Sequence, residues 1–391
     1  MIQKRANIHL KWIPIIATLL LSDSLNAAQD LQYTIAPYGY WQAIACSSDG
    51  SIVVASETDS HLIYVSTNSG ATFWPSSKLP AFALVCTPDA GTIVALAGVA
   101  YSSHDLGVTW KTNSLPGSVG SFAISADGTK WVCGNGNVFN QTDAPIYVSA
   151  DAGASWQQTS APLVPWTSIA CSADGNRLAA VYGGSHVYTS PDRGLTWTNT
   201  LPGDSTNFLY LIVSSSDGNK LVTIGNGIVC VSTNAATSWE RVGVAPGFIQ
   251  VAASADATTL ALIAGPQLFT STDSGALWKP RTAEIAGSPY GLTPRSVALS
   301  ANGNRLFTSS PGLVFTAPLP PAVLSFSWQS NFLALSWPSN QIGFVLESSP
   351  ALSSRPVWTS VTGSIFAGDY QYFVTNDLRA FPSTFYRLHK F

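Results

Sequence analysis

The stretch Ser103–Trp110 reads SHDLGVTW, and close copies of this phrase recur along the chain. The pattern is Ser-x-Asp-x-Gly-x-Thr-Trp after a short apolar or aromatic strand, and we call this eight-residue phrase the box. Clear copies begin at Ser149, Ser190 and Ser271, and weaker copies with Asn in place of Asp begin at Ser66 and Ser232. Self-similarity at a period of roughly 40 residues indicates a repeat architecture.

A second phrase, a short apolar strand followed by Ser-x-Asp-Gly, alternates with the box. Asp-Gly and Asn-Gly between apolar runs are strong hairpin signals, because these residues accept positive φ. The turn residues are Asp49, Asp127, Asp174 and Asp217 in four copies and Asp89, Asp256 and Asn302 in three looser copies. Seven copies predict seven repeats.

Each repeat reads as four strands, A to D, most clearly in the fourth. There strand A is Thr167–Ser172, strand B Arg177–Tyr182, strand C His186–Ser190 and strand D about 196–200. The Asp-Gly turn joins A to B, and the box joins C to D. Four antiparallel strands repeated seven times predict an all-β fold, a seven-bladed β-propeller over residues 29–320.

The seventh repeat lacks a box and a fourth strand, because Pro318, Pro320 and Pro321 follow its strand C. We expect residues 31–36 to supply the missing outer strand and to close the ring, which removes the open edges of the two end blades. Residues 321–391 carry short alternating strands outside the repeat, and they predict a small β-sandwich.

Residues 1–28 have the pattern of an export signal, with basic residues at Lys4, Arg5 and Lys11 and an apolar run over Trp12–Leu21. Small residues suited to cleavage end it at Ala28. The alternative is an uncleaved anchor, although the apolar run is short for a bilayer. We expect a secreted protein, whether periplasmic, cell-surface or extracellular.

The box resembles the Asp-box, or bacterial neuraminidase repeat, and the resemblance covers residues 31–320. It implies a β-propeller in which the box is a hairpin turn on the outer rim. Members of that family include sialidases, xyloglucanases, sortilin-type receptors and photosystem II assembly factors, so the resemblance implies a fold and no single activity. The tail is similar to a fibronectin type III-like module of secreted environmental bacterial proteins, through Ser336-Trp-Pro338, Leu346–Ser349 and Phe385–Leu388.

Composition excludes some function classes. The formal net charge is -3 and only 10% of residues are charged, so no basic field for nucleic acid is present. Cys46, Cys86 and Cys171 share one register in different repeats, which is too far apart for a disulfide. The pairing of Cys133 and Cys230 stays open, and no metal-binding spacing of Cys and His occurs. We expect no metal, no cofactor and no membrane span after removal of the signal.

Most acids of the repeats belong to A–B turns or boxes, which lie on one side of a propeller, here called the box face. The opposite side, formed by the D–A loops and B–C turns, is here called the D–A face. Its acids include Glu57, Asp59 and Asp143, which are either solvated loop charges or the paired carboxylates that a glycosidase needs. The three arginines and the Arg-Ile-Pro signature of a sialidase are missing, since only Arg295 enters this face.

Aromatic and polar side chains of the D–A face are the candidates for ligand binding. Trp41 and Trp166 align at the entry to strand A, where they either stack on a ligand or pack between blades. The candidate ligand-binding residues are Trp41, His61, Asn140, Trp166, His186, Tyr210, Tyr290 and Arg295. We expect a monomeric, non-catalytic propeller that binds a protein or a glycan. The alternative is a glycoside hydrolase or lyase that uses the loop carboxylates.

Overall fold

The computed structural model describes residues 32–34, 39–135, 143–184, 186–200, 208–245, 247, 249–281, 294–310 and 313–318, together with the strands of the C-terminal region named below. The predicted export signal lies outside the described residues. The described residues contain strands and turns and no helix, so an all-β fold is confirmed. None of them forms a helix of the length and apolarity that crossing a bilayer requires.

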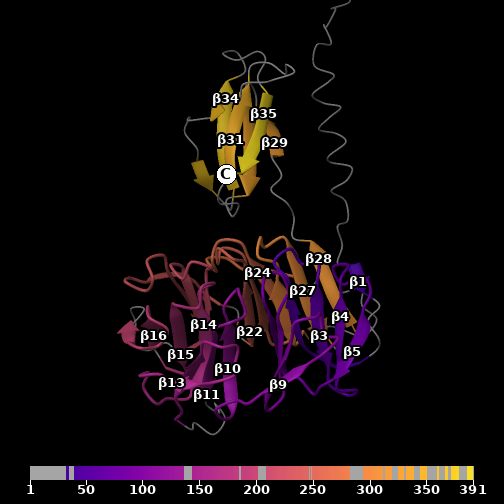
Figure 1. The fold of residues 1–391 in the computed structure, drawn as a ribbon. Coiled ribbons are helices and arrows are strands. Elements are labelled where there is room, and N and C mark those ends of the chain that lie inside the picture. The colour runs from indigo at the N-terminus through magenta and orange to yellow at the C-terminus, as the bar shows by residue number, and fades with distance from the viewer. Residues whose placement is uncertain are drawn as a thin grey trace, which may run out of the picture.

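Residues 32–318 form seven four-stranded antiparallel sheets within the described part of the chain, arranged in a ring (Figure 1). We number them sheet 1 to sheet 7 by their innermost strand A. The A strands are β2 (Trp41–Cys46), β6 (Ala83–Cys86), β10 (Val119–Ile124), β14 (Trp166–Cys171), β18 (Leu209–Ser214), β22 (Gln250–Ala253) and β26 (Ser296–Leu299). Each A strand contacts the next, and β2 contacts β26, so the ring is closed.

The other strands of each sheet follow outward in the order B, C and D. The B strands are β3 (Val53–Glu57), β7 (Ile93–Leu96), β11 (Trp131–Asn135), β15 (Leu178–Tyr182), β19 (Leu221–Gly225), β23 (Leu260–Ala264) and β27 (Arg305–Ser310). The C strands are β4 (Leu62–Ser66), β8 (Ala100–Ser103), β12 (Ile146–Ser149), β16 (Val187–Ser190), β20 (Ile228–Ser232), β24 (Gln267–Ser271) and β28 (Leu313–Pro318). The D strands are β5 (Trp74–Lys78), β9 (Lys111–Asn113), β13 (Gln157–Gln158), β17 (Thr198–Thr200), β21 (Glu240–Gly243), β25 (Lys279–Pro280) and β1 (Gln32–Thr34).

The outer strand of sheet 7 comes from the other end of the propeller sequence. Strand β1 pairs antiparallel with β28, with Tyr33 opposite Phe315. The prediction that a segment within residues 31–36 completes this sheet is confirmed, and the pairing extends over 32–34. The chain closes the ring without a covalent bond between its ends.

The seven A–B turns share one set of hydrogen bonds. In the first, the Ser47 hydroxyl donates to Asp49 Oδ1 over 2.6 Å, and the backbone N–H of Ser51 donates to the same oxygen over 2.9 Å. Gly50 takes a φ of 69°, a conformation that glycine adopts without strain. Thr87, Ser125, Ser172, Ser215, Ser254 and Ser300 make the same hydroxyl bond to the turn residues of the other sheets.

The boxes are hairpin turns between strands C and D. In the box after β8, the Ser103 hydroxyl donates to Asp105 Oδ1 over 2.8 Å and accepts from the Gly107 N–H over 2.8 Å. The Thr109 hydroxyl donates to Asp105 Oδ2 over 2.6 Å. Asn68 and Asn234 keep the acceptor role in their boxes. Both turn types therefore use their acids to build the fold, as the sequence predicted.

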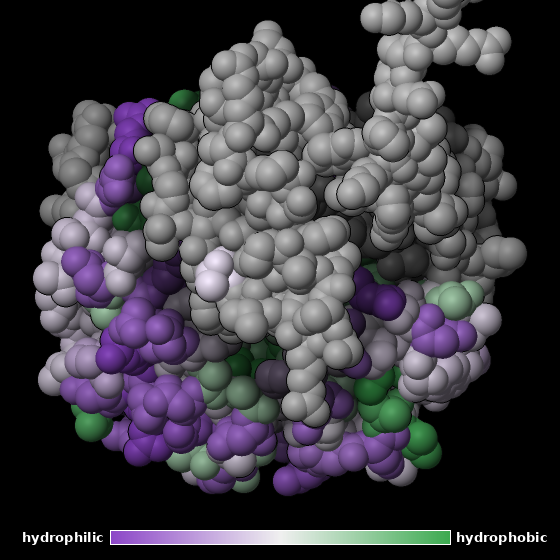
Figure 2. Space-filling model, turned by 90° about the horizontal axis from the view of Figure 1, so that it is seen from above, coloured by the Kyte–Doolittle hydropathy of each residue, from purple (hydrophilic) through white to green (hydrophobic). Residues whose placement is uncertain are grey.

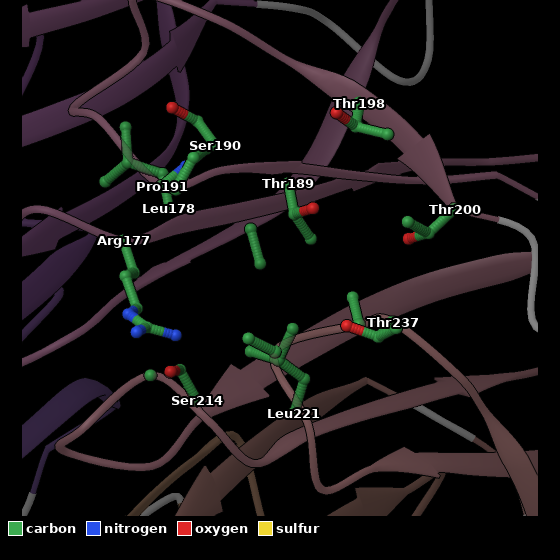
Figure 3. Close-up of a pocket in the computed structure, with 14 residues that line it drawn as sticks. Arg177, Leu178, Thr189, Ser190, Pro191, Thr198, Thr200, Ser214, Leu221 and Thr237 are labelled. Carbon is green, nitrogen blue, oxygen red and sulfur yellow. The ribbon is translucent and has the colours of Figure 1, made fainter.

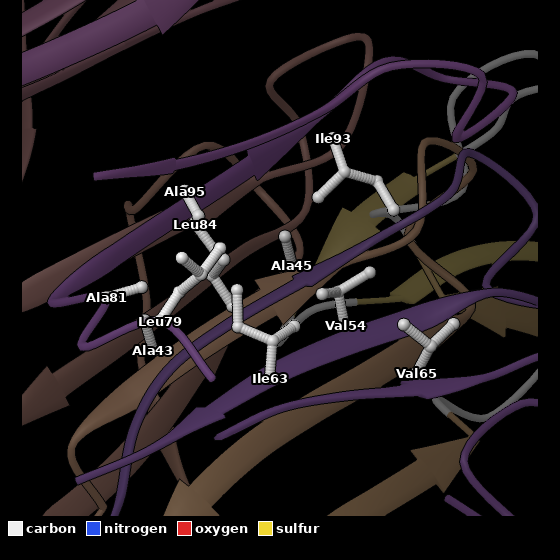
Figure 4. Packing of buried hydrophobic residues seen from close by; sticks show 10 residues of the cluster. All are labelled: Ala43, Ala45, Val54, Ile63, Val65, Leu79, Ala81, Leu84, Ile93 and Ala95. Atoms are coloured by element: carbon white, nitrogen blue, oxygen red, sulfur yellow. The ribbon is translucent and has the colours of Figure 1, made fainter. Parts of the chain in front are cut away.

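The hydrophobic core lies in layers between neighbouring sheets. Figure 4 shows one layer, in which Val54 and Ile63 of sheet 1 face Leu84 and Ile93 of sheet 2. These four side chains are 0–7% exposed. A single sheet would expose one such face to water, so the sheets stabilise one another only as a ring.

None of the five cysteines forms a disulfide. The thiol of Cys86 lies 3.1 Å from the carbonyl oxygen of Cys46, and Cys171 contacts the carbonyl oxygen of Ile124 in the same way. Burial raises the pKa of Cys86 and of Cys171 to about 12, so both stay protonated at neutral pH.

The C-terminal region forms two further sheets. One has the order β29 (Ser325–Gln329), β30 (Phe332–Pro338), β34 (Gln371–Asp377), β33 (Phe366–Gly368), and the other β32 (Thr359–Ser360), β31 (Phe344–Ser349), β35 (Phe385–Lys390). The strands of both sheets pair antiparallel. The packing of the two sheets into a sandwich remains a prediction.

Candidate binding face

Exposed hydrophobic side chains gather on the D–A face. Ten large hydrophobic side chains of the described residues are exposed, and six of them stand in D–A loops. The six are Tyr40, Phe82, Leu163, Phe208, Val244 and Ile249. The other four, Trp74, Val108, Leu195 and Leu277, lie in or beside boxes on the opposite side. Exposed apolar side chains on one face make that face a candidate interaction surface.

Several of these side chains occupy the residue just before strand A, where the backbone is held in place. The N–H of Phe82 donates to the carbonyl oxygen of Leu96 over 2.9 Å, and the N–H of Ile249 donates to that of Ile263 over 2.7 Å. Arg295 takes the same position in sheet 7, and its N–H bonds to Ser309 over 2.9 Å. Loop residues on such a rigid base keep their places without a ligand.

Arg295 and Tyr40 meet where the ring closes. The guanidinium carbon of Arg295 lies 6.0 Å from the centre of the Tyr40 ring, at the outer limit of a cation–π contact. Both side chains are exposed. The structure thus places predicted Arg295 on the candidate face, beside an aromatic residue that the sequence analysis did not select.

Trp41 and Trp166 are fully buried, each at 0% exposure. Their rings pack edge-on against Tyr64 and Tyr188, with centroid distances of 5.1 and 5.5 Å. The pairing of strands A and B shifts register directly after both tryptophans, and a bulge of this kind re-aims a side chain. This placement corresponds to packing between sheets, the alternative to ligand contact.

Glu57 is also buried, at 5% exposure, and it holds the B–C turn of sheet 1. Its carboxylate accepts hydrogen bonds from the backbone N–H groups of Tyr40, Asp59 and Ser60 and from the Ser60 hydroxyl. Burial is the largest single influence on its pKa and acts to raise it, but the hydrogen bonds together outweigh burial and lower the pKa. A carboxylate committed in this way is poorly suited to proton transfer.

The remaining predicted acids and histidine of this face are solvated. Asp59, His61 and Asp143 are exposed. Among the described residues, no hydrogen bond joins Asp143 to Glu57 or Asp59, and no three His, Cys, Asp or Glu side chains stand ready to hold a metal ion. Predicted Asn140 and Tyr290 lie outside the described residues.

His186 belongs to a group of aromatic rings at the B–C turn of sheet 4. Its ring stacks on Tyr182 at 5.8 Å and on Tyr188 at 6.3 Å, and Nδ1 lies 3.2 Å from the Tyr182 hydroxyl. Trp166 packs edge-on against Tyr182, so the structure brings two predicted residues into one group. Tyr210 is half-buried and lies against Gly183 of the same turn.

Tyr40, Phe82, Phe208 and Ile249 were not predicted from the sequence. A signal for them exists in the sequence, because each is a large apolar residue directly before strand A, at the end of a loop. These residues can be recognised from the sequence only when the first residue of strand A is known exactly.

Part of the box face is visible in Figure 2. Figure 2 views the propeller from the side on which β28 ends, and its coloured surface is largely hydrophilic with separate hydrophobic spots. A groove of about 260 Å³ lies between sheets 4 and 5 near the boxes (Figure 3). Leu178, Leu221 and Ala236 line it with several threonines. Its volume is slightly below the usual range of ligand pockets.

No protein-family model matches the chain, and no curated protein matches it. The fold is similar to that of solved β-propellers. The structure of YCF48 bound to D1 peptide matches with a TM-score of 0.55 and 15% identity, over 75% of this chain and 96% of that one. A GH74 xyloglucanase from Xanthomonas campestris matches with a TM-score of 0.55 and 14% identity, over 79% of this chain and 59% of that one. Hydrazine synthase of Kuenenia stuttgartiensis matches with a TM-score of 0.54 and 13% identity, over 74% and 98%.

Identities this low establish the fold and nothing beyond it. Together with the ring of four-stranded sheets, they show that residues 32–318 form a β-propeller.

Proposed function

We propose that this protein is an exported, non-catalytic propeller that binds a segment of another protein on its D–A face. The observation that carries the proposal is the gathering of six of the ten exposed large hydrophobic side chains in the D–A loops. The same face presents the exposed guanidinium of Arg295, so a partner with apolar side chains and few cations fits it best.

The character of the exposed side chains favours a protein over a glycan. Sugar rings stack on flat aromatic faces, whereas Leu163, Val244 and Ile249 are aliphatic and are 55–65% exposed. Aliphatic side chains of this kind match the apolar residues of a polypeptide. One similar structure is of a propeller bound to a peptide, which supports the proposal by analogy of fold.

The enzyme alternative, a glycoside hydrolase or lyase, is less well supported. It would use Glu57 with Asp59 or Asp143. Glu57 is buried and accepts four hydrogen bonds from its own turn and from Tyr40. A general acid or base must have a site free to exchange a proton with the substrate.

Two features of the chain ends belong to the same proposal. The pattern of residues 1–28 supports export. The order of strands in the two C-terminal sheets, with β34 returning beside β30 and β35 beside β31, fits a Greek-key sandwich of the fibronectin type III-like kind. We propose that this module is a separate domain appended to the propeller.

Selection of a random 12-residue peptide library with purified chain lacking residues 1–28 tests the proposal. Peptides rich in apolar residues should be enriched, and the double substitution Phe208→Glu with Ile249→Glu should weaken their binding at least tenfold. The matched control is Val108→Glu with Leu195→Glu, which alters two residues on the box face that are even more exposed, at 77% and 66%. Equal loss of binding in the control, no enriched peptide, or binding on a glycan array alone would each contradict the proposal.

A further inference from the structure

A belt of backbone hydrogen bonds runs through the A–B turns around the axis of the ring. The N–H of one turn donates to the carbonyl oxygen of the next turn along the chain, and each of these bonds is 2.7 Å long. The donors are Ala126, Ala173, Ser216, Ala255, Ala301 and Ser48, and their acceptors are Ala173, Ser216, Ala255, Ala301, Ser48 and Pro88. Six of the seven junctions between described sheets carry this bond.

The junction between sheets 2 and 3 is the one without it. Its donor position is occupied by Pro88, which has no backbone N–H. The carbonyl oxygen of Ala126, the expected acceptor, therefore receives no bond from the neighbouring turn. The interruption is a direct result of the sequence.

Side chains that link neighbouring A strands are also missing at this junction. At three other junctions, Ser121, Ser168 and Ser296 each accept from an N–H of the next A strand over 2.7–3.1 Å, and at a fourth Gln250 accepts from Val297. The equivalent residue of sheet 2 is Ala83, which offers no side-chain acceptor, and Ala43 of sheet 1 and Leu211 of sheet 5 offer none either. The thiol contacts made by Cys86 and Cys171 at two other junctions are also absent here, because Ile124 stands at that position.

The core at this junction is built differently as well. Trp131 is the strand B residue that pairs with the last residue of strand A, a position where the other six sheets have Val53, Ile93, Leu178, Leu221, Leu260 and Leu306. Its ring is 1% exposed and packs with Val94, Leu96 and Ala100 of sheet 2. The junction is therefore held mainly by apolar packing, which lacks the directional restraint of hydrogen bonds. Among the described residues, the polar link across this junction is the bond from Trp156 Nε1 to the carbonyl oxygen of Ser114.

We propose that the ring opens preferentially between sheets 2 and 3, and that this junction is a conformational device of the fold. The junction where the two chain ends meet, between sheets 7 and 1, keeps its belt bond and its serine bond and is the tighter of the two. Phe82 stands on the loop that enters β6, so opening moves one of the exposed side chains of the D–A face.

Hydrogen exchange followed by mass spectrometry on the mature chain tests this inference. Amides of β6 and β10 should exchange faster than those of the other A strands. The substitution Pro88→Ala restores the backbone N–H donor, and alanine is the residue that Ala126, Ala173 and Ala255 provide in other turns. One backbone hydrogen bond should slow amide exchange at this junction by about twofold to tenfold.

The matched control is Ala255→Pro, which removes the belt bond between sheets 6 and 7 at a position where sheet 2 already accepts proline. It should speed exchange in β22 and β26 by a similar factor and leave β6 and β10 unchanged. Equal exchange at all seven junctions of the unmodified protein would overturn the inference. So would a Pro88→Ala variant whose β6 and β10 exchange as before.

Discussion

The backbone N–H of Ala301 donates a 2.7 Å hydrogen bond to the carbonyl oxygen of Ser48, joining the last sheet of the ring to the first. The Ile44 N–H adds a bond to the Ser296 hydroxyl over 3.1 Å. On the outside, β1 pairs with β28. The noncovalent closure of the ring is thus secured at the turn, at the innermost strand and at the outer strand.

Ser296→Ala tests the middle of these links. Ser296 is 2% exposed, so the substitution leaves the Ile44 N–H without its acceptor in a buried place. We expect the free energy of unfolding to fall by about 1–2 kcal/mol, the usual penalty for one unsatisfied buried donor. Urea denaturation measures this change.

Ser168→Ala is the matched variant, because Ser168 accepts from the Ile212 N–H at a junction that the chain itself connects. A loss in Ser168→Ala with none in Ser296→Ala would show that the closing junction does not depend on this bond.

Two box glycines with the same backbone conformation differ in their surroundings. Gly70 and Gly153 have φ values of 82° and 81°. An added Cβ would lie 3.8 Å from the Phe73 ring in the first case and 2.4 Å from the Trp131 ring in the second. Gly70→Ala should therefore cost about 1 kcal/mol of backbone strain. Gly153→Ala should have the same backbone strain and should lose about 1–3 kcal/mol more, because the added methyl group overpacks against the Trp131 ring.

Ala236, with a φ of 68°, occupies the glycine position of the fifth box and shows that alanine is accepted where space allows. Thermal denaturation of the two variants measures the difference. Equal losses would mean that the Trp131 ring moves away without penalty.

Adjacent residues Tyr40 and Trp41 should separate binding from stability. Trp41 is fully buried, so Trp41→Ala should lower the free energy of unfolding by about 3–5 kcal/mol. Tyr40 is 46% exposed, so Tyr40→Ala should change the free energy of unfolding by less than about 1 kcal/mol. The same substitution should weaken peptide binding. Urea denaturation and peptide titration of both variants check this, and a stable Trp41→Ala protein would contradict the packing role.

The sequence predicted the propeller, its closing strand and the committed turn acids, because each of these follows from a local rule. An Asp-Gly turn or a box carries its own hydrogen-bond partners within eight residues, so the pattern determines the structure. The roles of Trp41 and Trp166 could not be predicted in the same way. The alignment of the two tryptophans could be seen in the sequence. The position of each indole ring, however, depends on the bulge that follows it, and no residue pattern predicts that bulge.

The candidate face shows a second limit of the sequence. Phe82 and Ile249 are apolar residues in loops, and apolarity alone predicts burial. Their exposure results from the position of the D–A loops at the rim, which depends on the packing of whole sheets. The effect of Pro88 could not be predicted from the sequence either. Its missing N–H is important only because seven turns, distant in the sequence, are joined by backbone hydrogen bonds in the folded ring.

Stability should fall in acid because of the turn carboxylates. Hydrogen bonds from Thr109 and Ser103 lower the pKa of Asp105 to about 2, and bonds from Ser155 and Ser149 do the same for Asp151. A folded-state pKa below the unfolded value means that the unfolded chain binds protons first as the pH falls. The stabilisation is present above about pH 4 and is lost progressively between about pH 4 and pH 2. Thermal denaturation across this range should show the loss.

The variant Asp105→Asn with Asp151→Asn keeps the hydrogen-bond acceptors, as Asn68 and Asn234 do in their boxes. Its melting temperature should depend less on pH between about pH 4 and pH 2. An unchanged pH dependence in this variant would place the acid sensitivity in other carboxylates.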